Sequence, residues 1–156
     1  MKSIYMVGSL RNGKMPEIAN KLAAAGYDAF ADWHAAGYEA DDKWQEHEQS
    51  RGRTYREALY GYHARDVFEF DLTHINRCDF VVLILPCGKS GHLELGWALG
   101  RGKPGFVLFD KEPERWDVMY QFANAVCFSV DELLVELANH VELGKDVTNL
   151  ARPGRA

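Results

Sequence analysis

A single carboxylate stands among apolar residues in the stretch that follows the most hydrophobic segment of the chain. Residues 80–85 form an uninterrupted apolar run, and the sequence Cys-Gly-Lys-Ser-Gly at 87–91 leads into a segment of helical spacing that carries Glu94. The positive end of a helix dipole favours a carboxylate in its first turns. Two interpretations are open: Glu94 pairs with Lys89, Arg101 or an amide, or it is a partly buried nucleophile or base.

A second candidate site is the glycine-punctuated loop after the first apolar run. Gly8, Ser9, Leu10 and Arg11 follow residues 3–7 and precede a segment with helical spacing. Backbone amides and a hydroxyl at such a strand exit can cradle an anion or an oxyanion. The glycine spacing matches neither a Walker loop nor a dinucleotide fingerprint. The loop is weak evidence by itself, because many α/β proteins have one.

An acid and a histidine lie one helical turn apart just before the central apolar run. These are Asp71 and His74, at the end of the long helical pattern 54–76. Either side chain could face solvent, cap a helix or point into a site. From spacing alone, a surface position for Asp71 is the better prediction.

Residues 32–53 differ in amino-acid composition from the rest of the chain. They combine Trp33, Trp44 and Tyr38 with many acids. In one interpretation this is a solvated, partly helical insertion that packs its aromatic residues on the domain. In the other it is a lid over a ligand, with aromatic side chains such as Trp33 that stack on a planar ring. Both stay open, and the acids are typical of a solvated face rather than a metal site.

The elements that must position these residues alternate along the chain. Strands are predicted at 3–7, 27–31, 80–85, 106–109 and 125–128, and helices at 14–25, 54–76 with a break near Gly61, after 91, and 131–143. A strand without polar alternation is buried on both faces, as in a parallel sheet covered by helices. The pattern predicts a single-domain α/β protein of the flavodoxin or Rossmann type, with about five parallel strands and helices on both faces. The domain is predicted to span 1–143, with Gly144 ending the last helix and a flexible tail at 144–156.

Composition limits the classes of function. The chain has 156 residues, a formal net charge of −5 and 47% hydrophobic residues. The negative charge argues against a nucleic-acid polymer as partner. The three cysteines, Cys78, Cys87 and Cys127, lack metal-ligand spacing and are expected to be reduced thiols. No apolar stretch approaches the roughly 18 residues of a membrane helix. We expect a soluble, cytoplasmic protein.

Three separate motifs together resemble the nucleoside 2-deoxyribosyltransferase superfamily, which includes the 2-deoxynucleoside 5-monophosphate N-glycosidases. They are Tyr-Met-Val-Gly-Ser-Leu-Arg at 5–11, Asp-Leu at 71–72, and Ser-Gly-His-Leu-Glu-Leu-Gly at 90–96. The resemblance runs from Lys2 to about Phe109. Its most specific part is the Ser-Gly turn followed by Glu-Leu-Gly and then Gly-Lys-Pro.

The resemblance implies a role for each matching position. Glu94 matches the glutamate that attacks the anomeric carbon and releases the base, and Asp71 matches an aspartate that positions the sugar or handles protons at the base. The sugar's 5-hydroxyl or 5-phosphate end is expected at Gly8, Ser9, Arg11, Ser90 and Gly91, with Leu10, Lys89 and His92 as further contacts. An adjacent carboxylate can stabilise or trap an oxocarbenium-like state, so the chemistry is consistent with these residues.

The first loop favours one branch of the superfamily. Gly-Ser-Leu-Arg-Asn-Gly at 8–13 resembles the monophosphate hydrolases, and Arg11 and Lys89 would supply cations for a 5-phosphate. The prediction is therefore hydrolysis of the N-glycosidic bond of a (deoxy)nucleoside 5-monophosphate. Alternatives are base exchange by a transferase, cleavage of nicotinamide dinucleotide, and a non-catalytic nucleotide sensor on the same fold.

The resemblance also implies assembly as a homodimer or larger homo-oligomer in which neighbours complete each other's sites. Candidates for that contribution are Trp116, Asp117, Met119 and Tyr120 in a short aromatic-rich segment. The expected partner is a small nucleotide or nucleoside. The mechanism needs neither a metal nor a cofactor.

Overall fold

The computed structural model describes the backbone of residues 1–150 and side chains as far as Gly144. Its sheet has five strands, all parallel, in the order β2-β1-β3-β4-β5. The strands are β1 (Ser3–Val7), β2 (Asp28–Phe30), β3 (Phe80–Ile84), β4 (Gly105–Leu108) and β5 (Ala125–Cys127). This order belongs to the flavodoxin-like doubly wound folds, whose strand order reverses between β1 and β3. The predicted fold class is confirmed.

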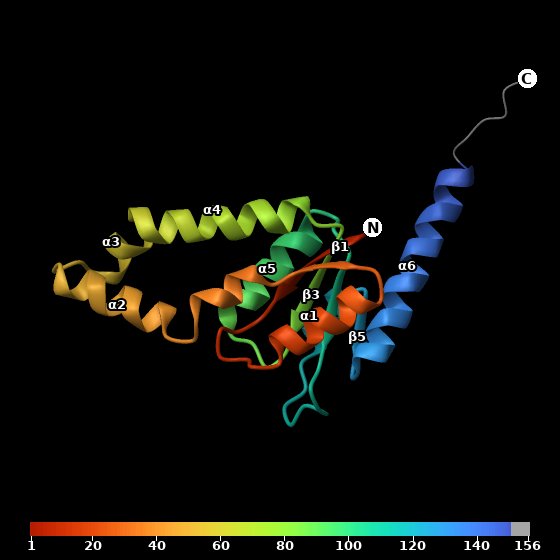
Figure 1. Ribbon diagram of the computed structural model, residues 1–156, viewed down its shortest axis with the longest axis horizontal. Helices are drawn as coiled ribbons and strands as arrows, with labels where there is room; N and C mark the ends of the chain where they lie inside the picture. Colours follow the sequence, from red (N-terminus) through yellow and green to blue (C-terminus); the bar gives the residue numbers. More distant parts are fainter. Residues whose placement is uncertain (151–156) are drawn as a thin grey trace, which may run out of the picture.

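Helices cover both faces of the sheet, as Figure 1 shows. They are α1 (Met15–Ala24), α2 (Ala40–Ser50), α3 (Tyr55–Leu59), α4 (Tyr62–Arg77), α5 (Lys89–Gly100) and α6 (Val130–Leu150), with the 3₁₀ turns η1 (Asp32–Ala36) and η2 (Val118–Phe122). The core divides into two clusters, one between the sheet and α1 and α6, the other between the sheet and α4 and α5. No helix within residues 1–150 combines the length and the apolar character needed to cross a bilayer.

Alternation along β1 assigns its side chains to the two clusters. Ile4 and Met6 pack in the cluster of α1 and α6, whereas Tyr5 and Val7 pack in that of α4 and α5. Successive side chains of a strand point to opposite faces, so the alternation follows directly from strand geometry. Tyr5 is therefore placed on the face that is covered by the two helices carrying Asp71 and Glu94.

The helix α5 approaches the sheet closely at its amino end because Gly91 has no side chain. A Cβ at Gly91 would lie 2.2 Å from Cys87 Sγ and 3.0 Å from Val7 Cγ1. Any larger residue would push the first turn of α5 away from β1 and β3. The sequence analysis expected a loop as far as 91, but the helix begins at Lys89, so Ser90 and Gly91 lie within its first turn.

The segment 32–53 forms η1 and α2 and projects, together with α3, beyond the sheet (Figure 1). It packs part of its aromatic content, since Trp44 stacks on His63 with ring centroids 6.4 Å apart. Its acids are exposed apart from Glu48, which is buried and paired with Arg53 at 2.6 Å. The packing of the aromatics favours the interpretation as a partly helical insertion. Its role as a lid stays a prediction.

Two helix boundaries were predicted with different success. The break near Gly61 is confirmed, because Gly61 is the N-cap that separates α4 from α3. The end of the last helix at Gly144 is wrong, since α6 continues to Leu150. A glycine ends a helix by adopting positive φ, and Gly144 is not among the glycines that do so. Residues 151–156 of the expected tail lie outside the described part of the chain.

Candidate active site

Three titratable side chains from three elements meet at the face covered by α4 and α5. The Tyr5 hydroxyl of β1 lies within hydrogen-bonding reach of the carboxyl groups of both Asp71, on α4, and Glu94, on α5. Tyr5 is only 1% exposed, and the two acids are partly buried. The cluster lies beside the point where the strand order reverses, between β1 and β3, which is where open α/β sheets bind ligands.

Burial and a like charge make Glu94 an unusual acid. Removal from water, followed by the negative charge of Asp71, raises the pKa of Glu94 from 4.5 to about 7, while the hydrogen bond from Tyr5 opposes the rise. Burial also raises the pKa of Asp71, against the effects of the Tyr5 bond and of nearby His74. Prediction from spacing alone favoured a surface position for Asp71, and this is wrong. The prediction drawn from the resemblance placed it at the site.

The three groups share few protons. Burial and the charges of both acids raise the pKa of Tyr5 far above its ordinary value, so the phenol stays protonated. One phenolic proton serves only one carboxylate at a time, so the second contact needs a protonated carboxyl that donates to the phenol oxygen. The Oδ1 atom of Asp71 is buried and has no hydrogen-bond partner among the described residues. One polar atom of the cluster is thus left for a ligand.

Tyr5 was not among the site residues predicted from the sequence, although it lies with Asp71 and Glu94. The signal was present, because Tyr5 is the one hydroxyl-bearing aromatic residue in an otherwise aliphatic stretch, Ile4 to Val7. A buried tyrosine needs a partner for its hydroxyl. Its ring stacks on Phe30 at 5.7 Å, and Phe30 stacks in turn on His74 at 3.9 Å. These contacts hold the phenol in place between the two acids.

The loop after β1 is folded by its own side chains. Ser9 Oγ accepts a hydrogen bond from the amide of Arg11 at 3.1 Å, and the Ser9 carbonyl accepts one from Asn12 at 2.9 Å. Gly8 allows close packing, because a Cβ there would lie 2.8 Å from Met15 Sδ. Leu10 is half-buried. The loop reaches the amino end of α1 as predicted, although no ligand contact of its residues is tested.

Two predicted binding residues instead make contacts within the protein. The indole nitrogen of Trp33 donates to the Met6 carbonyl at 2.8 Å, and its ring packs against both core clusters. The guanidinium of Arg11 lies 3.3 Å from Asp42 on α2, with both side chains largely exposed. Trp33 therefore forms a fixed wall beside Gly8, whereas Arg11 is held only by a surface ion pair of small energy.

The residues at the start of α5 divide by exposure. Lys89 and Ser90 are exposed and Gly91 is buried against the sheet. Gly88 is the N-cap and, as a glycine, provides no side-chain cap for the amides of the first turn. Such amides, at the positive end of a helix, favour an anion.

The aromatic segment 116–122 splits into an exposed part and an anchored part. Trp116 is 80% and Met119 60% exposed, and Asp117 caps η2 by accepting a bond from the amide of Met119 at 2.8 Å. Tyr120 is half-buried, and its hydroxyl lies 2.9 Å from His92 Nε2 within the same chain. Any contribution of these residues to a neighbouring subunit stays a prediction.

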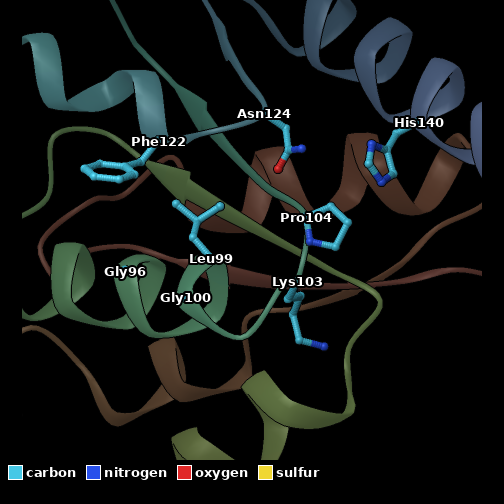
Figure 2. A pocket seen from close by; sticks show the side chains of 9 residues that line it. Gly96, Leu99, Gly100, Lys103, Pro104, Phe122, Asn124 and His140 are labelled. Carbon is cyan, nitrogen blue, oxygen red and sulfur yellow. The ribbon is translucent and has the colours of Figure 1, made fainter.

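A hollow lies at the opposite, amino edge of the sheet. Figure 2 shows this groove of about 630 Å³ between the end of α5, the turn before β4 and helix α6, with Leu99, Pro104, Phe122 and His140 around it. It is lined by none of the predicted site residues. Size therefore does not single out the chemically equipped part of the molecule.

Comparison of the sequence with protein-family models and with curated proteins gave no match. Solved structures do match the fold. A 2-deoxyribosyltransferase of Bacillus psychrosaccharolyticus superposes with a TM-score of 0.57 at 18% identity, covering 85% of this chain and 90% of its own. A conserved protein of Enterococcus faecalis gives 0.60 at 14% identity, covering 90% and 99%. The CMP N-glycosidase BcmB of Clostridium botulinum gives 0.50 at 15%, covering 88% and 99%. The chain has the fold of these proteins.

The arrangement of the site suits acid, base or nucleophilic chemistry. A partly buried carboxyl group with a pKa near 7, beside a second acid, is typical of functional sites. Among the side chains that the structure describes, no group of three or more acids, histidines or cysteines is placed to hold a metal ion. The chemistry that this chain's own groups can provide is attack by one carboxylate and proton transfer by the other.

Proposed function

We propose that the protein hydrolyses the N-glycosidic bond of a (deoxy)nucleoside 5-monophosphate and releases free base and sugar phosphate. The observation that carries the proposal is the cluster of Tyr5, Asp71 and Glu94 beside the reversal of strand order. The likeness of the fold to a CMP N-glycosidase and a 2-deoxyribosyltransferase supports the same class of chemistry.

Glu94 is the nucleophile in this proposal. Its carboxylate attacks the anomeric carbon as the bond to the base breaks, and the oxocarbenium-like state is stabilised by the nearby negative charge. Tyr5 holds the attacking oxygen and favours the ionised form, since its bond lowers the pKa of Glu94. Water then attacks the glycosyl–glutamate ester, and Glu94 is regenerated.

Asp71 provides the proton in this proposal. A leaving base departs more readily when a ring nitrogen or oxygen gains a proton. Burial raises the pKa of Asp71, and its Oδ1 atom has no partner among the described groups. The form of the pair that reacts in this proposal carries one proton, placed on Asp71 while Glu94 is ionised.

The 5-phosphate is assigned to the amino end of α5 and the loop after β1. The uncapped amides of the first turn of α5 and the exposed Lys89 and Ser90 favour an anion. Arg11 lies on the loop after β1, and a phosphate can compete for it because its pair with Asp42 is largely exposed.

Base exchange is the second candidate, favoured by the likeness to a 2-deoxyribosyltransferase. The two activities share the first step and differ only in whether water or a second base accepts the sugar. A non-catalytic nucleotide sensor is the competing hypothesis without chemistry.

The test is chromatography of free bases released from ribo- and deoxyribonucleoside monophosphates and from the matching nucleosides. We expect release from a monophosphate by the native protein and none by Glu94→Gln, with Glu46→Gln on the exposed face of α2 as the matched control. Release only in the presence of a second base would establish the transferase. Silence across the panel, with nucleotide bound equally by both proteins, would leave the sensor.

A further inference from the structure

Two side chains that are 28 residues apart form a hydrogen-bonded link beside the site. His92 Nε2 lies 2.9 Å from the Tyr120 hydroxyl, and His92 Nδ1 lies 2.7 Å from the Gly88 carbonyl oxygen. The sequence placed His92 as a ligand contact and Tyr120 as a contribution to a neighbouring subunit. The structure joins them within one chain.

The chemistry of the acceptors fixes the direction of this link. A carbonyl oxygen only accepts, so the Nδ1 atom of His92 carries a hydrogen and donates to Gly88. In the neutral imidazole the Nε2 atom is then an acceptor, and the Tyr120 hydroxyl donates to it. Both ring nitrogens of His92 are occupied by the protein.

The link attaches the start of α5 to the far side of the site. Tyr120 belongs to η2, and its ring packs edge-on against Phe109, at the end of β4, with centroids 5.2 Å apart. Gly88 is the N-cap of α5, and this helix has no side-chain cap at its amino end. The histidine therefore restrains a turn that its own sequence leaves uncapped.

The restrained turn also adjoins the reacting groups. Cys87, next to Gly88, is half-buried, and burial followed by the charge of Glu94 raises the pKa of its thiol. Burial, then the charges of Asp117 and Cys87, raise the pKa of Tyr120. A shift of the turn would displace the amides of its first residues.

We propose that His92 and Tyr120 are positioning residues that hold the first turn of α5 in the geometry that receives the phosphate end of the substrate. This inference takes its ligand from the proposed function. The pair acts through the turn and does not touch the sugar. Losing it weakens the binding of a phosphorylated sugar and leaves the handling of an unphosphorylated nucleoside unchanged.

The test uses 2-deoxyribose 5-phosphate as probe, because every deoxynucleoside 5-monophosphate contains it whatever its base. Calorimetric titration compares the native protein with His92→Ala, Tyr120→Phe, the double variant and His92→Gln. Tyr120→Phe keeps the ring on Phe109 and removes only the hydroxyl. His47→Ala and Tyr62→Phe, both at exposed positions, are the matched controls.

We expect Kd to rise about five- to tenfold in each single variant, as for one lost hydrogen bond. The Kd of the double variant should equal that of His92→Ala, because the two residues act through one link. Glutamine at 92 restores binding, since its amide can donate to Gly88 and accept from Tyr120. Where nucleosides are cleaved at all, kcat/KM for them is unchanged.

Equal Kd values in native and variant proteins would overturn the inference, as would multiplying effects in the double variant. Failure of the native protein to bind the sugar phosphate would overturn it too. Binding that depends on the pair, without base release from any nucleotide, would keep the inference and refute the hydrolase.

Discussion

The candidate site and the amino-edge groove differ in how their polar groups are paired. On the site side, Asp71 and Glu94 lie partly buried around one phenol, and Asp71 Oδ1 has no hydrogen-bond partner among the residues that the structure describes. At the amino edge, Lys103 beside the groove of about 630 Å³ donates to the carbonyls of Asn76 and Cys78. Buried and incompletely compensated charge of this kind is typical of functional sites.

Among the variants that test this difference, removal of the Asp71 carboxyl group should have the largest effect on base release. In Asp71→Asn we expect base release to fall by about 10²- to 10⁴-fold, because the departing base loses its proton donor. The native pH profile should be bell-shaped, falling above about pH 7 as the pair loses its last proton. Asp71→Asn should lack that upper limb. An upper limb that persists in the variant would assign the proton to another group.

Removal of the shared hydroxyl should have the next largest effect. The Tyr5 bond lowers the pKa of Glu94, so Tyr5→Phe should raise that pKa and leave less nucleophile ionised near pH 7. We expect a loss of about tenfold or more in kcat/KM, typical of a bond to a charged group, and an upper limb displaced to higher pH. Tyr62→Phe on an exposed face is the control. An unmoved profile would mean that Tyr5 is only part of the core.

Glu94→Gln should lose activity but gain stability at high pH, and this gain tests whether Glu94 is buried. Its folded-state pKa of about 7 exceeds the value of 4.5 in the unfolded chain, so wild-type stability falls as pH rises from 4.5 to about 7. Glu94→Gln cannot ionise and should melt on the order of 10 °C higher than wild type at pH 8, because a pKa rise from 4.5 to about 7 corresponds to about 3 kcal/mol. The two melting temperatures should converge at pH 4. A constant difference at both pH values would show that Glu94 is not buried in this way.

The smallest effect is expected at the groove. His140 lies edge-on to Phe80 and Phe106, at 5.8 and 6.1 Å, and lines the amino-edge groove. His140→Gln should cost about 1 kcal/mol of unfolding free energy through the lost aromatic contacts. Base release at a fixed substrate concentration should be unchanged. A loss comparable to that of Tyr5→Phe would mean that the groove takes part in the reaction.

The fold was predictable from sequence because the signals were local. Unbroken apolar runs marked the central strands, and Gly61 marked a helix break that the structure contains. The end of α6 was missed because a glycine signals termination only when the backbone there takes positive φ, and Gly144 stays helical. Residue type alone does not decide between those conformations.

The site was predictable in part. Glu94 and Asp71 were found through the resemblance, while the spacing of Asp71 indicated a surface acid. Tyr5 was missed because a lone tyrosine in a strand is usually a core residue, and its two acidic partners come from distant helices. The link between His92 and Tyr120 joins segments 28 residues apart, and no local pattern reports such a contact.

The central claim is that Glu94 is the nucleophile. Its most direct test is mass spectrometry of the protein after its reaction with a monophosphate substrate is quenched with acid. If Glu94 is the nucleophile, a peptide that contains it gains the mass of the sugar phosphate minus one water, and Glu94→Gln yields neither adduct nor base. Base release with an adduct on another residue, or undiminished release by Glu94→Gln, would contradict the account.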